Sequence, residues 1–348
     1  MALTKAGLQV DVISPRRVSL RELFRGRTSL TTVPELRESR RAYVGPPRMP
    51  WLDEAVWRGI ARKLYSGYLA KYGPPDILHA HSMCPAGMLA AELPARARVL
   101  TEHLSTFLGP DGPRLGARLS PQMNRFAARI GVGPGITATM ERIAGSGGPW
   151  ICIPNLVDTE FFTPARPPSR VIRVLTVSNL TPNKRVDWVI RAFDRSFEKS
   201  NAELCIIGDG AERGRLERQA AQLESASRIR FLGSQSRAQV RAHLDQCTIF
   251  ALASRHETLG VVLLEAMAMG RPVIATNSGG PASTVTDDVG ILVEVNDFSA
   301  FAEGMRRLVS QIDTYDPDSI RRYCQRRFGE QAVTTQLIAV YEEALRNV

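Results

Sequence analysis

Two glutamates stand on either side of a predicted helix start in the second half of the sequence. The segment 257–265 reads ETLGVVLLE, with Glu257 just before the helix and Glu265 about two turns along it. The first amides of a helix have no intrahelical partner and attract phosphate. Here they belong to Thr258, Leu259, Gly260 and Val261. Because carboxylates bind sugar and ribose hydroxyls well, a phosphate-binding helix start with two carboxylates indicates a nucleotide sugar.

The elements around this segment form a βαβ unit. A buried strand is expected at 248–253, then a short polar loop, a helix of about three turns, and a second strand at 273–276. Gly270 has the position of a helix C-cap glycine, and Pro272 follows where the helix cannot continue. The glutamate pair alone is more simply explained as a helix-start charge and an exposed helix glutamate.

The surrounding sequence favours the functional interpretation. The residues HETLGVVLLEAMAMGRPVIAT (256–276), followed by SGGP (278–281), resemble the donor-binding segment of family 4 glycosyltransferases of group 1 type, which have the GT-B fold. In that family the pattern is glutamate, seven residues, glutamate. The resemblance also implies that Gly279 and Gly280 offer backbone amides near the donor sugar.

The resemblance extends over nearly the whole chain and implies α/β architecture, with two Rossmann-like domains facing a cleft. The acceptor-side domain is expected at 1–153, a proline-rich connector at 154–170 and the donor domain at 171–325. A last helix, 326–348, is expected to cross back to the N-terminal domain. The family's first strand and Gly-Gly loop are missing from this sequence, so unpaired strand edges are expected. A start codon placed too late or a degenerate paralogue would explain the difference.

The rest of the N-terminal part contains one clear helix. Residues 9–13 are expected to form a strand, and residues 16–50 a long loop with one short helix. Apolar residues recur at helical spacing from Trp51 to Tyr72, which predicts an amphipathic helix. The aromatic residues Trp51, Trp57 and Tyr65 are expected in the core rather than on a binding platform.

Histidines follow two predicted strands of this part, 77–80 and 99–101. Ligands of open α/β sheets bind beyond the carboxyl ends of strands, so position makes His79, His81 and His103 candidates. The phrases HAH and TEH resemble the family, in which the histidine at the place of His103 contacts the donor sugar. For His79 and His81 a core or hinge role is favoured. No carboxylate or cysteine is spaced to complete a metal site.

A lysine is expected to face the donor diphosphate from the second domain. Lys184 falls in a loop before a helix, where the family places a lysine that offsets the charge of the leaving group. Many relatives carry arginine where this chain has Asn179. Leaving-group stabilisation is therefore expected to depend more on Lys184 and the helix end, unless Arg185 substitutes for the missing arginine.

The charge of the chain indicates anionic partners. The formal net charge is +10, and residues 16–41 contain eight arginines against three glutamates. A membrane surface or a lipid diphosphate would suit this stretch, as would a simple solvated face. Nucleic acid is not expected, since aromatic residues are not interleaved with the basic ones. Five scattered cysteines and the absence of a long apolar run or signal peptide predict a cytoplasmic protein, peripheral to the membrane if it binds there.

The resemblance implies a metal-independent hexosyltransferase that needs no cofactor. It would move a sugar from a UDP-sugar or GDP-sugar donor to a polysaccharide or lipid-linked acceptor with retention of anomeric configuration. The expected catalytic residues are His103, Lys184 and Glu257. The expected donor-binding residues are Asn179, Thr258, Leu259, Gly260, Val261, Glu265, Gly279 and Gly280. Two alternatives stay open: an inactive nucleotide-sugar-binding paralogue or partner subunit, and a nucleotide-sugar epimerase of GT-B architecture.

Overall fold

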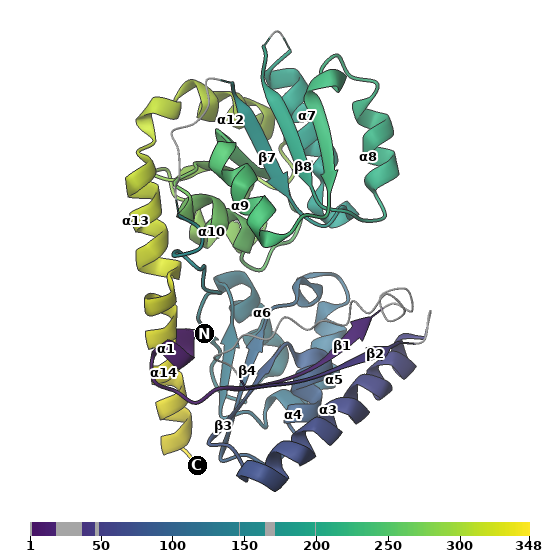
Figure 1. The fold of residues 1–348 in the computed structure, drawn as a ribbon, viewed down its shortest axis with the longest axis vertical. Coiled ribbons are helices and arrows are strands. Elements are labelled where there is room, and N and C mark those ends of the chain that lie inside the picture. Colours follow the sequence, from purple (N-terminus) through teal and green to yellow (C-terminus); the bar gives the residue numbers. More distant parts are fainter. Residues whose placement is uncertain (1, 19–36, 46–48, 146, 164–170, 199) are drawn as a thin grey trace.

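The computed structural model describes residues 2–18, 37–45, 49–145, 147–163, 171–198 and 200–348. Two α/β units lie one above the other, and two helices from the C-terminal end of the chain run along them (Figure 1). All the strand pairs in both units are parallel. This is the two-domain α/β architecture predicted from the sequence.

The C-terminal unit is built on one six-stranded sheet. Its strands are β7 (Arg173–Val177), β8 (Glu203–Ile207), β9 (Ile229–Gly233), β10 (Ile249–Leu252), β11 (Val273–Thr276) and β12 (Gly290–Val293). Around them lie α7 (Val186–Ser196), α8 (Arg213–Ala220), α9 (Arg237–Gln246), α10 (Val261–Ala268), α11 (Pro281–Thr284) and α12 (Phe298–Ser310). Single turns are η3 (Pro182–Lys184), η4 (Ala226–Arg228) and η5 (Ile312–Thr314).

The strand order in this sheet places a crevice next to the predicted donor residues. The order is β12-β11-β10-β7-β8-β9, so the first strand of the sheet lies beside the fourth. Connections leave β7 and β10 in opposite directions, which opens a crevice at their carboxyl ends. Every residue of β10 and β11 is buried, as expected for central strands covered on both faces.

The N-terminal unit contains two separate sheets. One has β3 (Ile77–His81), β4 (Ala97–Glu102), β5 (Ala128–Gly131) and β6 (Ile151–Cys152), and the other β1 (Asp11–Val18) and β2 (Arg37–Val44). The helices are α1 (Ala2–Lys5), α3 (Pro50–Tyr72), η1 (Met83–Gly87), α4 (Met88–Ala90), η2 (Ser105–Leu108), α5 (Gly112–Met123) and α6 (Pro134–Ala144). Within the described residues, β1 and β3 each pair on one side only, so the expected unpaired edges are present.

The last two helices connect the units. Helix α13 (Pro317–Phe328) runs beside the C-terminal unit and α14 (Glu330–Arg346) beside the N-terminal one (Figure 1). Val333, Val340 and Tyr341 of α14 pack in one apolar cluster with Val99 and Ile130 of the N-terminal sheet. The prediction that the final helix crosses back is therefore confirmed.

The predicted loop at 16–50 is wrong where the structure describes it. Strand β1 continues to Val18, and β2 runs from Arg37 to Val44. Exposed Arg37, Ser39 and Arg41 alternate along β2 with half-buried residues, so the strand has no apolar period by which it could be recognised. The remaining parts of that prediction, 19–36 and 46–48, lie outside the described residues.

Helix α3 confirms one prediction and corrects another. Tyr65 is 3% exposed and belongs to the core, and Trp57 is half-buried. Trp51, in the first turn, is 70% exposed, so its predicted place in the core is wrong. The apolar face of the helix is thus covered at Tyr65 but uncovered at its beginning.

Candidate active site

The loops that follow β7 and β10 are hydrogen-bonded to each other at the crevice. The side chain of Asn183 accepts a bond from the His256 amide (3.1 Å) and donates one to the His256 carbonyl (3.0 Å). The Arg255 amide donates to the Asn183 carbonyl at 2.8 Å. These bonds place Lys184 beside Glu257, with Nζ 2.5 Å from Oε2. Two residues 73 positions apart, both predicted to be catalytic, therefore form an ion pair.

The guanidinium of Arg185 is buried and bonded within the protein. Arg185 is therefore not free to take the role of the arginine that was expected at the position of Asn179. Its guanidinium donates to the carbonyls of Ala253 (2.9 Å) and Ser254 (3.3 Å) and lies 4.0 Å over the Trp188 ring. Arg185 is 4% exposed, and burial lowers its pKa. It supports the carboxyl end of β10. Asn179 itself is exposed at the end of β7.

Helix α10 begins beside this ion pair. Its N-cap is Gly260 with φ of +82°, a left-handed conformation that favours glycine. Three amides at this start, those of Leu259, Gly260 and Val261, donate to no backbone carbonyl among the described residues. Val261 is the first residue of the helix. The helix has eight residues, fewer than the three turns expected. Its start nevertheless presents donors of the kind that bind phosphate.

The segment after β11 packs directly on the donor loop. The Glu257 amide donates to the Ser278 carbonyl (2.9 Å), and the Gly280 amide donates to the Glu257 carbonyl (2.7 Å). The Gly280 amide is therefore occupied, which differs from its predicted role. A Cβ atom on Gly280 would lie 2.3 Å from the Leu259 nitrogen, so only glycine permits this approach. Gly279 has φ of +110°.

Glu265 lies on α10 without an ion-pair partner among the residues that the structure describes. Burial raises the pKa of its carboxyl to about 7, and the charge of Arg237 acts in the opposite direction. Glu265 is half-buried. Its charge state therefore changes near neutral pH.

Three histidine rings stack at the ends of β3 and β4. The His79 and His81 ring centroids are 4.4 Å apart and those of His81 and His103 are 5.2 Å apart. His81 Nδ1 lies 2.9 Å from His103 Nε2. Burial and the nearby His81 lower the pKa of His103 to about 4, and burial also lowers the pKa of His81. Both rings are therefore neutral at pH 7, and one of them donates an N–H to the other.

His79 has the structural role that the sequence favoured. Its Nδ1 lies 2.6 Å from the Tyr341 hydroxyl on α14, and its Nε2 lies 2.7 Å from Thr101 Oγ1. Both ring nitrogens are thus occupied by hydrogen bonds inside the protein. Burial lowers the pKa of His79 well below its usual value, so the ring stays neutral. His79 fastens the returning helix to β3.

The N-terminal unit meets the donor loop directly. Thr258 Oγ1 donates to the His103 carbonyl at 3.1 Å. A Cβ atom on Gly133 would lie 2.3 Å from the Thr258 carbonyl oxygen, and one on Gly135 would lie 3.6 Å from the Gly279 Cα. The site therefore joins His103 on one side to Glu257 and Lys184 on the other. Asn183 and Arg185 were missed as organising residues because their partners lie 68 to 73 positions away.

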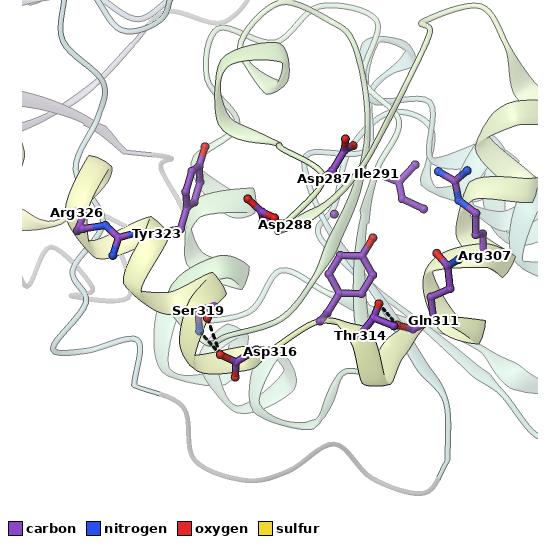
Figure 2. A pocket seen from close by; sticks show the side chains of 12 residues that line it. Asp287, Asp288, Ile291, Arg307, Gln311, Thr314, Asp316, Ser319, Tyr323 and Arg326 are labelled. Carbon is purple, nitrogen blue, oxygen red and sulfur yellow. Dashed lines mark hydrogen bonds between the residues drawn. The ribbon is translucent and has the colours of Figure 1, made fainter.

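A hollow lies away from this site in the C-terminal unit. Figure 2 shows it between residues of α12, η5 and α13 and the loop before β12; its volume is about 760 Å³. Three aspartates (Asp287, Asp288 and Asp316) and two arginines (Arg307 and Arg326) are among the residues that line it. None of the predicted site residues lies there. Its excess of carboxylates disfavours a nucleoside diphosphate.

The described part of the chain offers neither a metal cluster nor a membrane span. No group of three or more His, Cys, Asp or Glu side chains in the described ranges is arranged to hold a metal ion. No helix in the same ranges is long and apolar enough to cross a membrane. Metal independence stays a prediction.

Comparisons with known proteins cover both units. Residues 1–161 match the family Glycosyltransferase Family 4, and residues 158–322 match Glycosyl transferases group 1. N-acetyl-alpha-D-glucosaminyl L-malate synthase of Bacillus anthracis is 30% identical over 177 residues, which are 50% of this chain and 46% of that protein. The chain thus spans about half the length of the relatives that it matches first.

Another relative is matched over a longer stretch. The GDP-mannose-dependent alpha-(1-6)-phosphatidylinositol monomannoside mannosyltransferase of Mycolicibacterium smegmatis is 29% identical over 251 residues. The match covers 64% of each of the two chains. It therefore reaches beyond either single unit.

Solved structures show the same fold. Sucrose-phosphate synthase from Thermosynechococcus elongatus superimposes with a TM-score of 0.82 at 20% identity, covering 100% of this chain and 92% of that one. Anabaena Alr3699/HepE in complex with UDP-glucose gives a TM-score of 0.71 at 20% identity over 90% and 87% of the two chains. With two family matches that together span residues 1–322 and a GT-B architecture, the chain belongs to the family 4, group 1 glycosyltransferases.

Proposed function

We propose that the chain is a retaining glycosyltransferase. It moves a hexose from a UDP-hexose or GDP-hexose donor to a saccharide or lipid-linked acceptor. The observation that carries the proposal is the meeting of Lys184, Glu257 and the start of α10 at the crevice between β7 and β10. A cation and unoccupied helix amides suit a diphosphate, and the adjacent carboxylate suits a sugar. His103 faces this group from the other unit.

The leaving diphosphate needs stabilisation as the bond to the sugar breaks. Lys184 supplies a positive charge and the amides at 259–261 supply hydrogen-bond donors. Both are fixed in position and partly shielded from water, which strengthens their effect on the developing charge. In the present structure Glu257 neutralises Lys184. A diphosphate at the start of α10 competes for the lysine, which frees the Glu257 carboxylate to accept bonds from sugar hydroxyls.

The sugar is oriented from both sides of the cleft. Glu257 approaches it from the C-terminal unit and His103 from the N-terminal unit, as a neutral hydrogen-bonding group. The acceptor oxygen then bonds to the anomeric carbon on the face from which the phosphate oxygen leaves. The acceptor's proton passes to that phosphate oxygen, so the configuration is retained without an enzymatic nucleophile.

The donor and acceptor classes draw support from the named relatives. Alr3699/HepE was solved with UDP-glucose, which supports a UDP-sugar donor. The Mycolicibacterium smegmatis relative is named for GDP-mannose, so GDP stays the alternative. Its name also gives a phosphatidylinositol monomannoside, which supports a lipid-linked acceptor here. In the same scheme Glu265 holds the ribose hydroxyls of the nucleotide.

A lipid-linked acceptor would bring the N-terminal unit to an anionic membrane surface. Arg16, Arg37 and Arg41 are exposed on β1 and β2. The ion pair of Arg17 with Asp53 (3.1 Å) joins this sheet to the first turn of α3, where Trp51 is 70% exposed. Arginines beside an exposed tryptophan suit a headgroup layer, so we place the protein peripherally on the cytoplasmic face.

Replacing Lys184 tests the proposed reaction. Lys184→Ala should lower kcat by about 100-fold or more, because the charge that develops on the leaving diphosphate loses its cation. The measurement is the rate of nucleoside diphosphate release at saturating donor and acceptor. Lys63→Ala, an exposed lysine on α3, is the matched control. An effect confined to KM would show that Lys184 only binds the donor.

The titration of Glu265 provides a second test. Its carboxyl has a pKa of about 7, so the ionised form that accepts ribose hydroxyls forms as the pH rises from 6 to 8. Wild-type affinity for UDP or GDP should therefore rise over this range by more than that of Glu265→Gln. The variant controls for titration of the phosphate itself. Identical pH profiles by calorimetry would remove Glu265 from the ribose site.

Vesicle binding tests the membrane surface. The triple variant Arg16→Gln, Arg37→Gln and Arg41→Gln should bind anionic phosphatidylserine vesicles at least tenfold more weakly at low salt, since each basic residue near the surface contributes about 1 kcal/mol. The control is a second triple variant, Arg191→Gln, Arg195→Gln and Arg306→Gln, in the C-terminal unit. Equal binding of the two variants and the wild type would mean that the arginines of β1 and β2 only face solvent and do not bind a membrane.

A further inference from the structure

A fully buried carboxylate lies directly behind His103. Glu102, the last residue of β4, is 0% exposed and has no cationic partner among its hydrogen bonds. Its Oε1 accepts from the amides of His103 (2.9 Å) and Leu104 (2.8 Å), and its Oε2 accepts from the amide of Met83 (2.8 Å). Three backbone donors thus converge on one carboxylate.

This carboxylate connects the two loops that border the cleft. The Met83 amide belongs to the first residue of η1, two positions after His81 at the end of β3, and the other two amides belong to the loop between β4 and η2. Burial raises the pKa of Glu102, and the three amides act against that rise. A buried carboxylate is costly unless hydrogen bonds satisfy it, and here three backbone amides do so. An apolar residue at this position would leave those three amides without an acceptor, so the carboxylate fixes the two segments relative to each other.

The position of His103 depends on these bonds at three points. Its amide is held by Glu102, its ring by His81 (2.9 Å), and its carbonyl receives the Thr258 hydroxyl of the donor loop (3.1 Å). A shift of the His103 backbone would therefore move both the ring and the contact between the units. We propose that Glu102 is a positioning residue that sets His103 against the donor sugar; this rests on the proposed function.

The test distinguishes a loss of binding to the donor sugar from a loss of binding to the nucleotide. Glu102→Gln keeps the shape of the side chain, but its NH₂ group must face at least one of the three amides, donor against donor. The affinity for UDP-glucose or GDP-mannose should fall about tenfold, while that for free UDP or GDP stays unchanged, because the nucleotide contacts lie in the other unit. Glu92→Gln, an exposed glutamate of the same unit, is the control.

A double-mutant cycle with His103→Ala decides whether Glu102 acts through His103. The double variant should bind nucleotide sugar no more weakly than His103→Ala alone, since the ring that Glu102 positions is then absent. Additive losses would overturn the proposal. Failure of the wild type to bind UDP or GDP would instead overturn the proposed function itself.

A measurement without ligand completes the test. The chain has five histidines, so ring ¹⁵N spectra resolve the His103 tautomer. In Glu102→Gln the His103 signals should shift while those of His243 and His256 stay in place; unchanged His103 signals would contradict the proposal. If the Gln variant does not fold, Glu102→Asp retains the charge on a shorter side chain. It should then show smaller changes in the same direction.

Discussion

The ion pair between Lys184 and Glu257 is the interaction on which the site depends. Glu257 Oε2 also accepts a bond from Ser254 Oγ at 3.2 Å, but the bonds that bring the two loops together join residues 68 to 73 positions apart. Asn183 joins the two loops through both polar atoms of its amide, and Arg185 binds the carbonyls at the end of β10. The strand order brings β7 beside β10, so these bonds span the crevice of the sheet. The Lys184 ammonium, the Glu257 carboxylate and the start of α10 therefore lie next to one another.

The second constraint is the close approach of the two units. The Thr258 hydroxyl reaches the His103 carbonyl, and Gly133 lies so near the Thr258 carbonyl that a side chain would not fit. Helix α14 holds the arrangement from behind, because Tyr341 bonds to His79 in the same ring stack that contains His103. Chemistry on the sugar would therefore be coupled to how the units meet.

Much of the donor unit could be predicted from sequence, because its central strands are apolar runs and its helices carry clear end signals. The strand at 273–276 has the predicted bounds. Strand β2 could not be recognised, since its exposed face is arginine and serine. Hydrogen bonds between distant residues also leave no local signal. For that reason the occupied amide of Gly280 and the roles of Asn183 and Glu102 emerged only from the structure.

The proposed reaction is transfer of a sugar from a nucleoside diphosphate sugar at the Lys184–Glu257 site. The most direct measurement is release of free UDP or GDP from a panel of nucleotide sugars, with and without lipid-linked acceptors, followed by the anomeric configuration of the product. A retaining glycosyltransferase should give acceptor-dependent release of one nucleotide and a product with retained configuration. Binding without release from every donor would leave only a recognition site. Conversion of the donor in the absence of acceptor would indicate an epimerase instead, and either result would rule out glycosyl transfer by this site.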